Sequence, residues 1–304
     1  MFIRLLSWSV QKLSHSALLK LARALGTLWY FLIPIRCSVA KANVRRTLVA
    51  QGHSVDVDKV VLESCRQLTM YAMEMLRWSS LPWGALEKEC LELRGLDYYK
   101  EALARGKSPV LVSIHQGPFE AMFAILAQRG WPQHSFYKPM SNQEVERYWL
   151  SMRQRQGLNQ LPSKRARDEI EQVLERGETL VFFCDQHLPA HHSVVCSFFG
   201  QLAATTPAPV KLASRYGLDI LPVHTFRSAE DPTKHIVEFS PPFELEGEPE
   251  SDDFIFQNTE RLNRIFEQWI IEHPGQWLWH HKRFKVHDNP SGWDIPTALR
   301  DYLD

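Results

Sequence analysis

The feature that most constrains this fold is the stretch PVLVSI, residues 109–114, which ends directly at His115. A short, nearly continuous apolar run bounded by turn residues is typical of a strand buried on both faces of a parallel sheet. Gln-Gly-Pro follows, and then an apolar segment, 118–129, with the length and composition of a helix. A buried strand that turns straight into a helix is half of a βαβ unit, so this stretch predicts an α/β fold.

The same alternation continues to the end of the chain. Strand-like segments occupy 134–138, 179–184, 218–226 and 235–240, and helical segments occupy 142–157, 163–177, 206–217 and 252–274. Before residue 85 the pattern is helical throughout, with segments 40–52 and 56–80. We therefore expect an N-terminal helical region, 1–85, and one α/β domain, 86–304, whose largely parallel sheet is flanked by helices.

Charge and cysteine usage exclude several classes of protein. Lys+Arg and Asp+Glu both total 35, so no global electrostatic field points to nucleic acid as a partner. The five cysteines are scattered without Cys-x-x-Cys spacing. This pattern fits a reducing compartment and argues against a disulfide framework or a zinc ribbon.

The N-terminal segment 17–35 is apolar but carries Lys20 and Arg23. Its uncharged part, 24–35, is shorter than the roughly 20 residues that span a hydrocarbon core. Cations interspersed with leucines and with Trp8, Trp29 and Tyr30 are typical of a helix in the membrane interface. The alternative is a helix packed on the protein's own core.

Two residues at the first strand end could perform acid–base chemistry. His115 is expected at the carboxyl end of a sheet strand, where ligand sites of open α/β sheets lie. Pro118 fits the first helical position, which makes Glu120 roughly the third helical residue, near the positive end of the helix dipole. A carboxylate on one ring nitrogen leaves the other nitrogen free as a general base. The stretch contains no Ser or Cys nucleophile, so it suits deprotonation of a substrate hydroxyl that attacks an acyl carbonyl.

These residues carry a resemblance. His-x-x-x-x-Glu after a buried strand resembles the signature of glycerolipid-type acyltransferases, and its surroundings resemble the late acyltransferases of lipid A biosynthesis. Matching segments follow in order: FYKPMSN at 136–142, YWLSMRQRQG at 148–157, FFCDQH at 182–187, SFFGQLAATT at 197–206, and the closing WHHKRFK at 279–285. The stretch HLPAHHSVVCSFFG, 187–200, departs from the family's glycine-rich turn.

The resemblance implies roles for several residues. His115 is the general base and Glu120 its partner, while Arg153 and Asp185 match positions that the family needs for activity or substrate binding. Lys138 lies in the matching 136–142 segment and is expected to contact substrate. We expect the reaction to need no metal or redox cofactor. From the N-terminal segment we expect the protein on the cytoplasmic face of the cell inner membrane, as a monotopic protein or with a single N-terminal anchor.

Two other groups of residues have competing interpretations. A group of cations is either a solvated helix surface or a basic platform for an acidic acyl carrier protein or acceptor phosphates. Asp185, His187, His191 and His192 could suggest a metal, but their spacing matches no known zinc pattern, so we expect none. The cations are Lys138, Arg147, Arg153, Arg155, Lys164, Arg165 and Arg167.

The sequence therefore predicts a membrane-associated O-acyltransferase. It would move a fatty acyl chain from an acyl thioester, with acyl carrier protein as the expected donor, to a hydroxyl of a lipid A precursor. A lysophospholipid, glycolipid or aminolipid acceptor remains an alternative. A non-catalytic lipid- or carrier-binding protein and a thioesterase-like hydrolase are further alternatives.

Overall fold

The computed structural model describes residues 2–78, 81, 84–137, 139–155, 157–162 and 166–299. Its centre is a seven-stranded sheet in the order β1-β9-β8-β2-β5-β3-β4. All neighbouring strands are parallel except β8 and β9, so the prediction of a largely parallel sheet is confirmed. The strands are β1 (Leu91–Arg94), β2 (Val110–Ser113), β3 (Gln133–Tyr137), β4 (Leu158–Pro162), β5 (Thr179–Phe183), β8 (Ile220–Arg227) and β9 (His235–Phe239).

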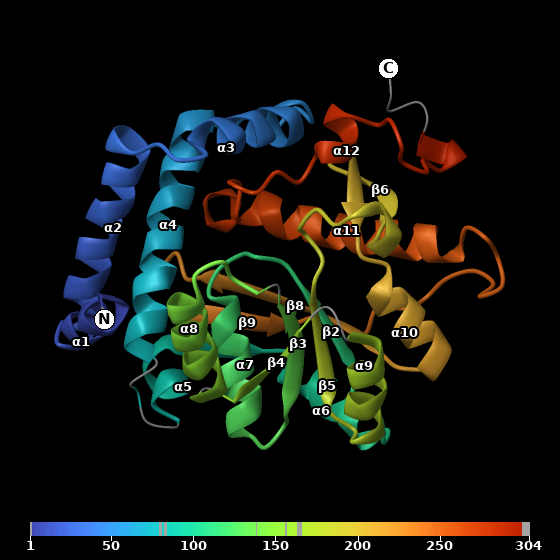
Figure 1. Cartoon of the computed structure of the whole chain (residues 1–304), viewed down its shortest axis with the longest axis horizontal. Helices are drawn as coiled ribbons and strands as arrows, with labels where there is room; N and C mark the ends of the chain where they lie inside the picture. Colours follow the sequence, from blue (N-terminus) through green and yellow to red (C-terminus); the bar gives the residue numbers. More distant parts are fainter. Residues whose placement is uncertain are drawn as a thin grey trace.

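Helices cover both faces of the sheet, because the central strands β2, β5 and β8 present apolar side chains on both sides (Figure 1). Alternate residues of β2 divide between two buried clusters: Val110 and Val112 face α10 and α11, whereas Leu111 faces α6 and α7. The central strands therefore lie in the middle layer of an α/β/α sandwich. The covering helices are α6 (Leu96–Ala104), α7 (Phe119–Gln128), α8 (Gln143–Arg155), α9 (Ala166–Glu175), α10 (Ala208–Tyr216) and α11 (Phe254–Glu272).

The N-terminal region is helical, as predicted, and packs on the α/β layers through α4. The Asp56 carboxylate accepts hydrogen bonds from the backbone N–H groups of Asp58 and Lys59, so it caps α4. Helix α2 lies along α4 and forms an outer edge of the molecule (Figure 1). A Cβ on Gly26 would lie 2.5 Å from the Cα of Arg66, so this glycine permits the close approach of the two helices. The helices are α1 (Phe2–Gln11), α2 (His15–Leu32), α3 (Cys37–Val44), a π-helical turn (Arg45–Val49) and α4 (Val57–Trp78).

By length and composition, no single described helix could cross a membrane. The segments His15–Leu32 and Cys37–Val49 meet that test only when taken together, and they are bent by 90° relative to one another.

Several short elements were not predicted. The largest is an antiparallel hairpin in the region where the sequence departs from the family pattern. Its two-residue turn has positive φ at both Phe199 (53°) and Gly200 (68°), which matches the right-handed twist of the strands. The unpredicted elements are α5 (Ala85–Cys90), β1, α6, β4, β6 (Val194–Phe198), β7 (Gln201–Thr205) and α12 (Lys285–Asp288), with 3-10 turns at Ala190–His192 and Pro274–Gln276.

Candidate active site

The site begins with the alignment of two neighbouring strands. Ser113 of β2 is paired with Phe183 of β5, so two residues further along the chain His115 and Asp185 emerge side by side at the carboxyl edge of the sheet. Gly117 then turns the chain at a φ of 59°, where a Cβ would collide with the carbonyl oxygen of Thr225. Only glycine fits this position, and the tight turn places α7 directly after the histidine.

Asp185 holds His115 through two hydrogen bonds. Its Oδ1 accepts the His115 Nδ1–H at 2.7 Å, and its Oδ2 accepts the His115 backbone N–H at 2.9 Å. The indole N–H of Trp277 also donates to Oδ2, at 2.8 Å. Burial alone would raise the pKa of Asp185, but His115 and the Trp277 N–H lower it to about 2. Asp185 is therefore ionised at neutral pH and fixes the His115 tautomer with the proton on Nδ1.

The opposite side of the imidazole is accessible. The His115 side chain is 21% exposed, while Asp185 behind it is 2% exposed. The Gln186 side-chain amide donates toward Nε2 at 3.3 Å. The rings of Phe119 and Phe183 pack against the imidazole at centroid distances of 5.1 and 4.7 Å. The arrangement gives an oriented imidazole with an apolar surround, whose Nε2 contacts the Gln186 amide.

Glu120 does not form the contact that the sequence suggested. We expected its carboxylate to lie on the His115 ring, but Oε1 accepts hydrogen bonds from Nε and Nη2 of Arg153, and Asp185 occupies Nδ1 instead. The physical reason is local: Pro118 is the N-cap rather than the first helical residue, so Glu120 is the second residue of α7. There its side chain meets Arg153 of α8 in a buried ion pair.

Arg153 is an internal residue and not a member of an exposed basic platform. Its guanidinium lies 3.4 Å from the centre of the Trp149 ring and also donates to Gln160 Oε1 at 2.6 Å. The second carboxylate oxygen of Glu120, Oε2, is buried and has no hydrogen-bond partner among the described residues. Arg153 therefore holds the carboxylate by one oxygen and leaves the other available.

Other residues that we singled out are dispersed. Arg147 and Arg155 of α8 are exposed, as the platform interpretation requires. Lys138, Lys164 and Arg165 lie outside the described residues, and the side chain of Arg167 is also not described. His191 and His192 are exposed, and the backbone N–H of His187 donates to His281 Nε2. Asp185 binds His115 instead of these three histidines.

Sequence reasoning missed the contribution of the closing segment. It did not assign Trp277 to the site, but this buried residue is a direct partner of Asp185. Arg283, which is fully buried, donates to the carbonyl oxygens of Gln186 and Ala204 and to Thr205 Oγ1. Burial lowers the pKa of Arg283 to about 10, which leaves it charged at neutral pH. The match of 279–285 to the family motif was the available signal for a functional tail.

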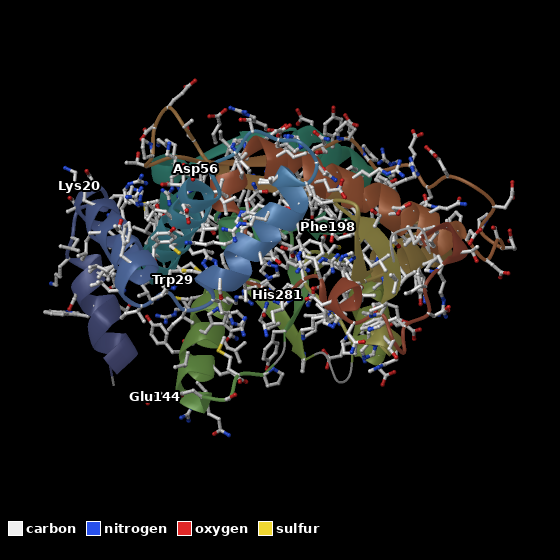
Figure 2. All side chains as sticks on the ribbon, turned by 90° about the horizontal axis from the view of Figure 1, so that it is seen from above. Lys20, Trp29, Asp56, Glu144, Phe198 and His281 are labelled. Atoms are coloured by element: carbon white, nitrogen blue, oxygen red, sulfur yellow. The ribbon has the colours of Figure 1, made fainter. Side chains whose placement is uncertain are left out.

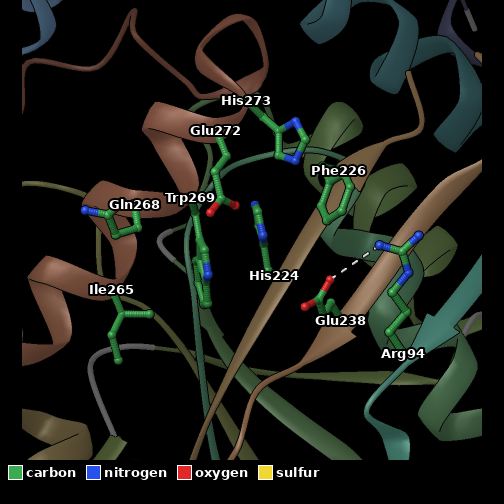
Figure 3. A pocket seen from close by; sticks show the side chains of 9 residues that line it. All are labelled: Arg94, His224, Phe226, Glu238, Ile265, Gln268, Trp269, Glu272 and His273. Atoms are coloured by element: carbon green, nitrogen blue, oxygen red, sulfur yellow. Dashed lines mark ion pairs between the residues drawn. The ribbon is translucent and has the colours of Figure 1, made fainter. Parts of the chain in front are cut away.

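A separate pocket of about 580 Å³ lies where α11 crosses β8 and β9, and His115 is not among its lining residues (Figure 3). In it, the rings of His224 and Trp269 lie face to face, 4.7 Å apart. Burial, with a smaller effect of His273, lowers the pKa of His224 to about 2, so this histidine is neutral at neutral pH. An ion pair between Arg94 and Glu238 forms part of the rim.

The largely parallel sheet, with His-x-x-x-x-Glu directly after β2, agrees with the fold expected for an acyltransferase. The comparison with known families is more specific. The chain belongs to the bacterial lipid A biosynthesis acyltransferases, whose family model matches residues 2–286.

Several characterised relatives are similar to this chain. It is 26% identical to the lipid A biosynthesis palmitoleoyltransferase of Escherichia coli K12 over 92% of this chain and 88% of the relative. It is 23% identical to the lipid A biosynthesis lauroyltransferase of the same organism, over 92% and 89% of the two chains. A lipid A biosynthesis acyltransferase of Haemophilus influenzae is 28% identical over 62% of this chain, and the alignment spans 57% of that relative's length.

Proposed function

We propose that this acyltransferase moves a fatty acyl chain from an acyl thioester to a hydroxyl group of a lipid A precursor. Membership of the family supports the acceptor class. The observation that supports the mechanism is the His115 imidazole, which Asp185 holds at Nδ1 and whose side chain is 21% exposed.

In the proposed reaction His115 acts as a general base. Nε2 takes the proton of the acceptor hydroxyl while the oxygen attacks the thioester carbonyl carbon, and an ester C–O bond forms. The C–S bond of the tetrahedral intermediate then breaks, and the thiolate leaves with the proton that Nε2 had taken. Asp185 stabilises the imidazolium between these two steps, so the acyl group passes directly from donor to acceptor.

The Glu120–Arg153 pair is proposed to position substrate beside the base. Both side chains are buried, and Glu120 Oε2 keeps a free acceptor oxygen. This oxygen can accept a hydrogen bond from a second hydroxyl of a sugar acceptor, and Arg153 fixes the orientation of the carboxylate. Lys138 is proposed as a further substrate contact on the basis of the family segment alone.

Acyl carrier protein is the proposed donor. Arg147 and Arg155 are exposed on α8, the helix that also carries Arg153, and an acidic carrier could dock against them. Activity with this donor should then fall as salt rises, because surface charges are screened over about 10 Å at 0.1 M ionic strength. Activity with acyl-CoA should change much less.

Membrane association is proposed through one face of α2 and the loop after it. Leu21, Leu25, Leu28 and Leu32 follow helical spacing and are 39–70% exposed, whereas Leu18, Ala22 and Gly26 are buried on the opposite face. Phe31 adds to this exposed apolar surface, and Ile33 and Ile35 extend it past the end of the helix. A helix with one apolar face of this kind inserts into the boundary between headgroups and acyl chains.

The test of the proposed reaction offers the purified full-length protein acyl carrier protein or coenzyme A thioesters as donors, and a lipid A precursor, a lysophospholipid or water as acceptors. Mass spectrometry of the products should show acylated lipid A precursor as the dominant product. Release of free fatty acid only, or transfer to lysophospholipid only, would contradict the proposal.

The membrane proposal has a matched control on α8. Leu28→Asp together with Leu32→Asp should reduce binding to phospholipid vesicles, and Val145→Asp, which changes an exposed residue outside α2, should leave it unchanged. Equal binding by the two proteins in a vesicle flotation assay would contradict a role for α2.

A further inference from the structure

Two cysteines and a histidine from three separate segments meet beside the bend between α2 and α3. Cys37 is the first residue of α3, Cys65 lies in the middle of α4, and His280 lies in the closing segment after α11. Each of the three is at most 5% exposed. Among the described residues they are the one group of three or more potential metal-ligating side chains whose ligand atoms all lie within 4.8 Å of one another.

The distances match those of a filled metal site. The two sulfur atoms are 3.8 Å apart, and Cys65 Sγ is 3.4 Å from His280 Nε2. With zinc–sulfur bonds of about 2.3 Å, zinc–nitrogen bonds of about 2.0–2.1 Å and tetrahedral angles, two bound thiolates lie about 3.8 Å apart and a thiolate and an imidazole nitrogen about 3.5 Å apart. The third pair, Cys37 Sγ and His280 Nε2, lies within 4.8 Å, so the three ligand atoms surround a space of about the size that a small ion needs.

The surroundings hold the ligands in place. The side-chain amide of Asn43, on α3, donates to the carbonyl oxygens of Trp279 and His281, at 2.8 and 2.9 Å, and so fixes the backbone on both sides of His280. The Trp29 ring packs on the His280 ring at a centroid distance of 4.7 Å and covers the site from the α2 side. Figure 2 shows Trp29 and His281 on the same side of the molecule as α3. This support reduces the ordering cost of binding an ion.

We propose that Cys37, Cys65 and His280 bind a thiophilic metal ion, zinc(II) or copper(I). Two thiolates and an imidazole select ions of this class over magnesium or calcium, which prefer oxygen ligands. Two thiolates cancel the charge of a zinc ion, so the filled site would bury no net charge. Three protein ligands leave a fourth position, which a water molecule takes on zinc and which copper(I) does not need.

The ion would join the membrane-facing bend to the candidate active site. His280 lies three residues after Trp277, whose indole N–H donates to Asp185. Cys65 is adjacent to Ser64, whose hydroxyl donates to the Trp277 carbonyl oxygen at 2.9 Å. The metal would therefore fix α3 and α4 against the segment that supports the His115–Asp185 pair, and it would stabilise the folded chain by mass action.

The first experiment measures binding to the full-length protein after treatment with a chelator and a reductant. Zinc titration against a chromophoric competitor should give one equivalent per chain, and cobalt(II) should give thiolate charge-transfer absorption. Copper(I), titrated with its own chelator, identifies which of the two ions binds more tightly. Cys37→Ser, Cys65→Ser and His280→Ala should each weaken binding by more than about 100-fold, since even outer-shell changes cost about 10- to 100-fold.

The control is Cys196→Ser, which removes another fully buried thiol, on β6, and should leave binding unchanged. A second measurement needs no variant. One equivalent of metal should slow the alkylation of Cys37 and Cys65, as mapped by mass spectrometry. The alkylation rate of Cys196 should be the same with and without metal. The proposal is overturned if wild-type protein binds zinc and copper(I) no more tightly than the three ligand variants, or if the two thiols react equally fast with and without metal.

Discussion

Two buried carboxylates of this protein hold histidines in very different ways. Asp185 forms a group with His115 and Trp277 that we call the His115 cluster. Glu74 of α4 forms a second group, the Glu74 cluster, with Arg227, His235 and His15. In the Glu74 cluster, Arg227 donates to the carboxylate twice, at 2.6 and 3.1 Å, and the two histidines contact Oε1 at 2.8 and 3.0 Å. Each of these side chains is therefore bound to another residue of the Glu74 cluster.

The two clusters differ in the solvent exposure of their side chains. His235 and Glu74 are 0% exposed, whereas the His115 side chain is 21% exposed. Burial would raise the pKa of Glu74, but the charges of His235 and Arg227 outweigh it and hold that pKa well below its ordinary value. Both clusters thus contain an ionised carboxylate on a histidine. His15 is also partly exposed, at 16%, but its Nε2 is bound to Glu74, whereas the Nε2 of His115 contacts the Gln186 amide and is the atom that meets the acceptor in our proposal. Composition alone does not distinguish a structural cluster from a catalytic one.

The largest expected effect is on stability at the Glu74 cluster. Glu74→Gln should lower the free energy of unfolding by about 3–5 kcal/mol, because it leaves the Arg227 charge buried without its partner. Urea unfolding measures the change. A loss below about 1 kcal/mol would mean that water or neighbouring groups satisfy Arg227. It would contradict the structural role that we assign to the Glu74 cluster.

His115→Ala should have the opposite profile. Transfer to the lipid acceptor should fall about 10³-fold, equivalent to about 4 kcal/mol, because the general base is gone. The unfolding midpoint in urea should fall less than for Glu74→Gln, because Asp185 keeps the hydrogen bonds from the backbone N–H of residue 115 and from the Trp277 indole. Near wild-type turnover by the variant would exclude His115 as the base.

Asp185→Asn should slow transfer about 10²-fold, because a neutral amide no longer stabilises the imidazolium or selects the tautomer. The effect should appear mainly in kcat, with KM for the acceptor nearly unchanged, since Asp185 contacts the histidine and not the substrate in our proposal. An increase confined to KM would instead assign Asp185 to substrate binding.

The Glu120–Arg153 pair lies between these extremes, buried like the Glu74 cluster but with one open oxygen. Arg153→Lys should reduce transfer about tenfold, since lysine keeps the charge but loses the planar contacts to Glu120 and Trp149. Glu120→Gln should cost less activity in the Arg153→Lys protein than in the wild type. Additive losses in this double-mutant cycle would show that the two residues act independently.

The smallest expected effect is a pH dependence of stability. The pKa of Asp185 is about 2 in the folded protein and about 4 in an unfolded chain, so its contribution is fully present above pH 4 and is lost as the pH falls toward 2. An asparagine side chain cannot titrate, so the difference in unfolding free energy between wild type and Asp185→Asn should shrink by about 1 kcal/mol from pH 5 to pH 3. A constant difference would contradict the lowered pKa.

The sequence predicted the fold well where side-chain periodicity is strong. The sequence shows the buried strands clearly at 109–114 and 179–184, because each is a short apolar run of strand length. The helices after them are recognisable by their greater length. Strand β1 and strand β4 were missed because Leu91–Arg94 and Leu158–Pro162 are short and half polar. The β6–β7 hairpin was missed because its turn places Phe199, and not glycine or asparagine, at the first positive φ.

The sequence predicted the position of His115 better than its contacts. It placed His115 at the carboxyl end of a buried strand, and the structure agrees, whereas the role expected for Asp185 came from the resemblance to the family. The carboxylate that binds the ring is decided by the pairing of β2 with β5, which brings Asp185 beside His115 although it lies 70 residues further along the chain. Trp277 reaches Asp185 from 92 residues away, and no local pattern encodes such a contact.

The strand order has a consequence for the order of events during synthesis. Strand β2, which carries His115, lies between β5 and β8, so its pairing on one side must wait until residues 220–227 have left the ribosome. Trp277 emerges some 50 residues later still. A nascent chain that already contains both His115 and Asp185 therefore lacks the residue that completes their hydrogen bonds. Translation thus delays completion of the contacts among His115, Asp185 and Trp277 until almost the whole chain is available to fold around them.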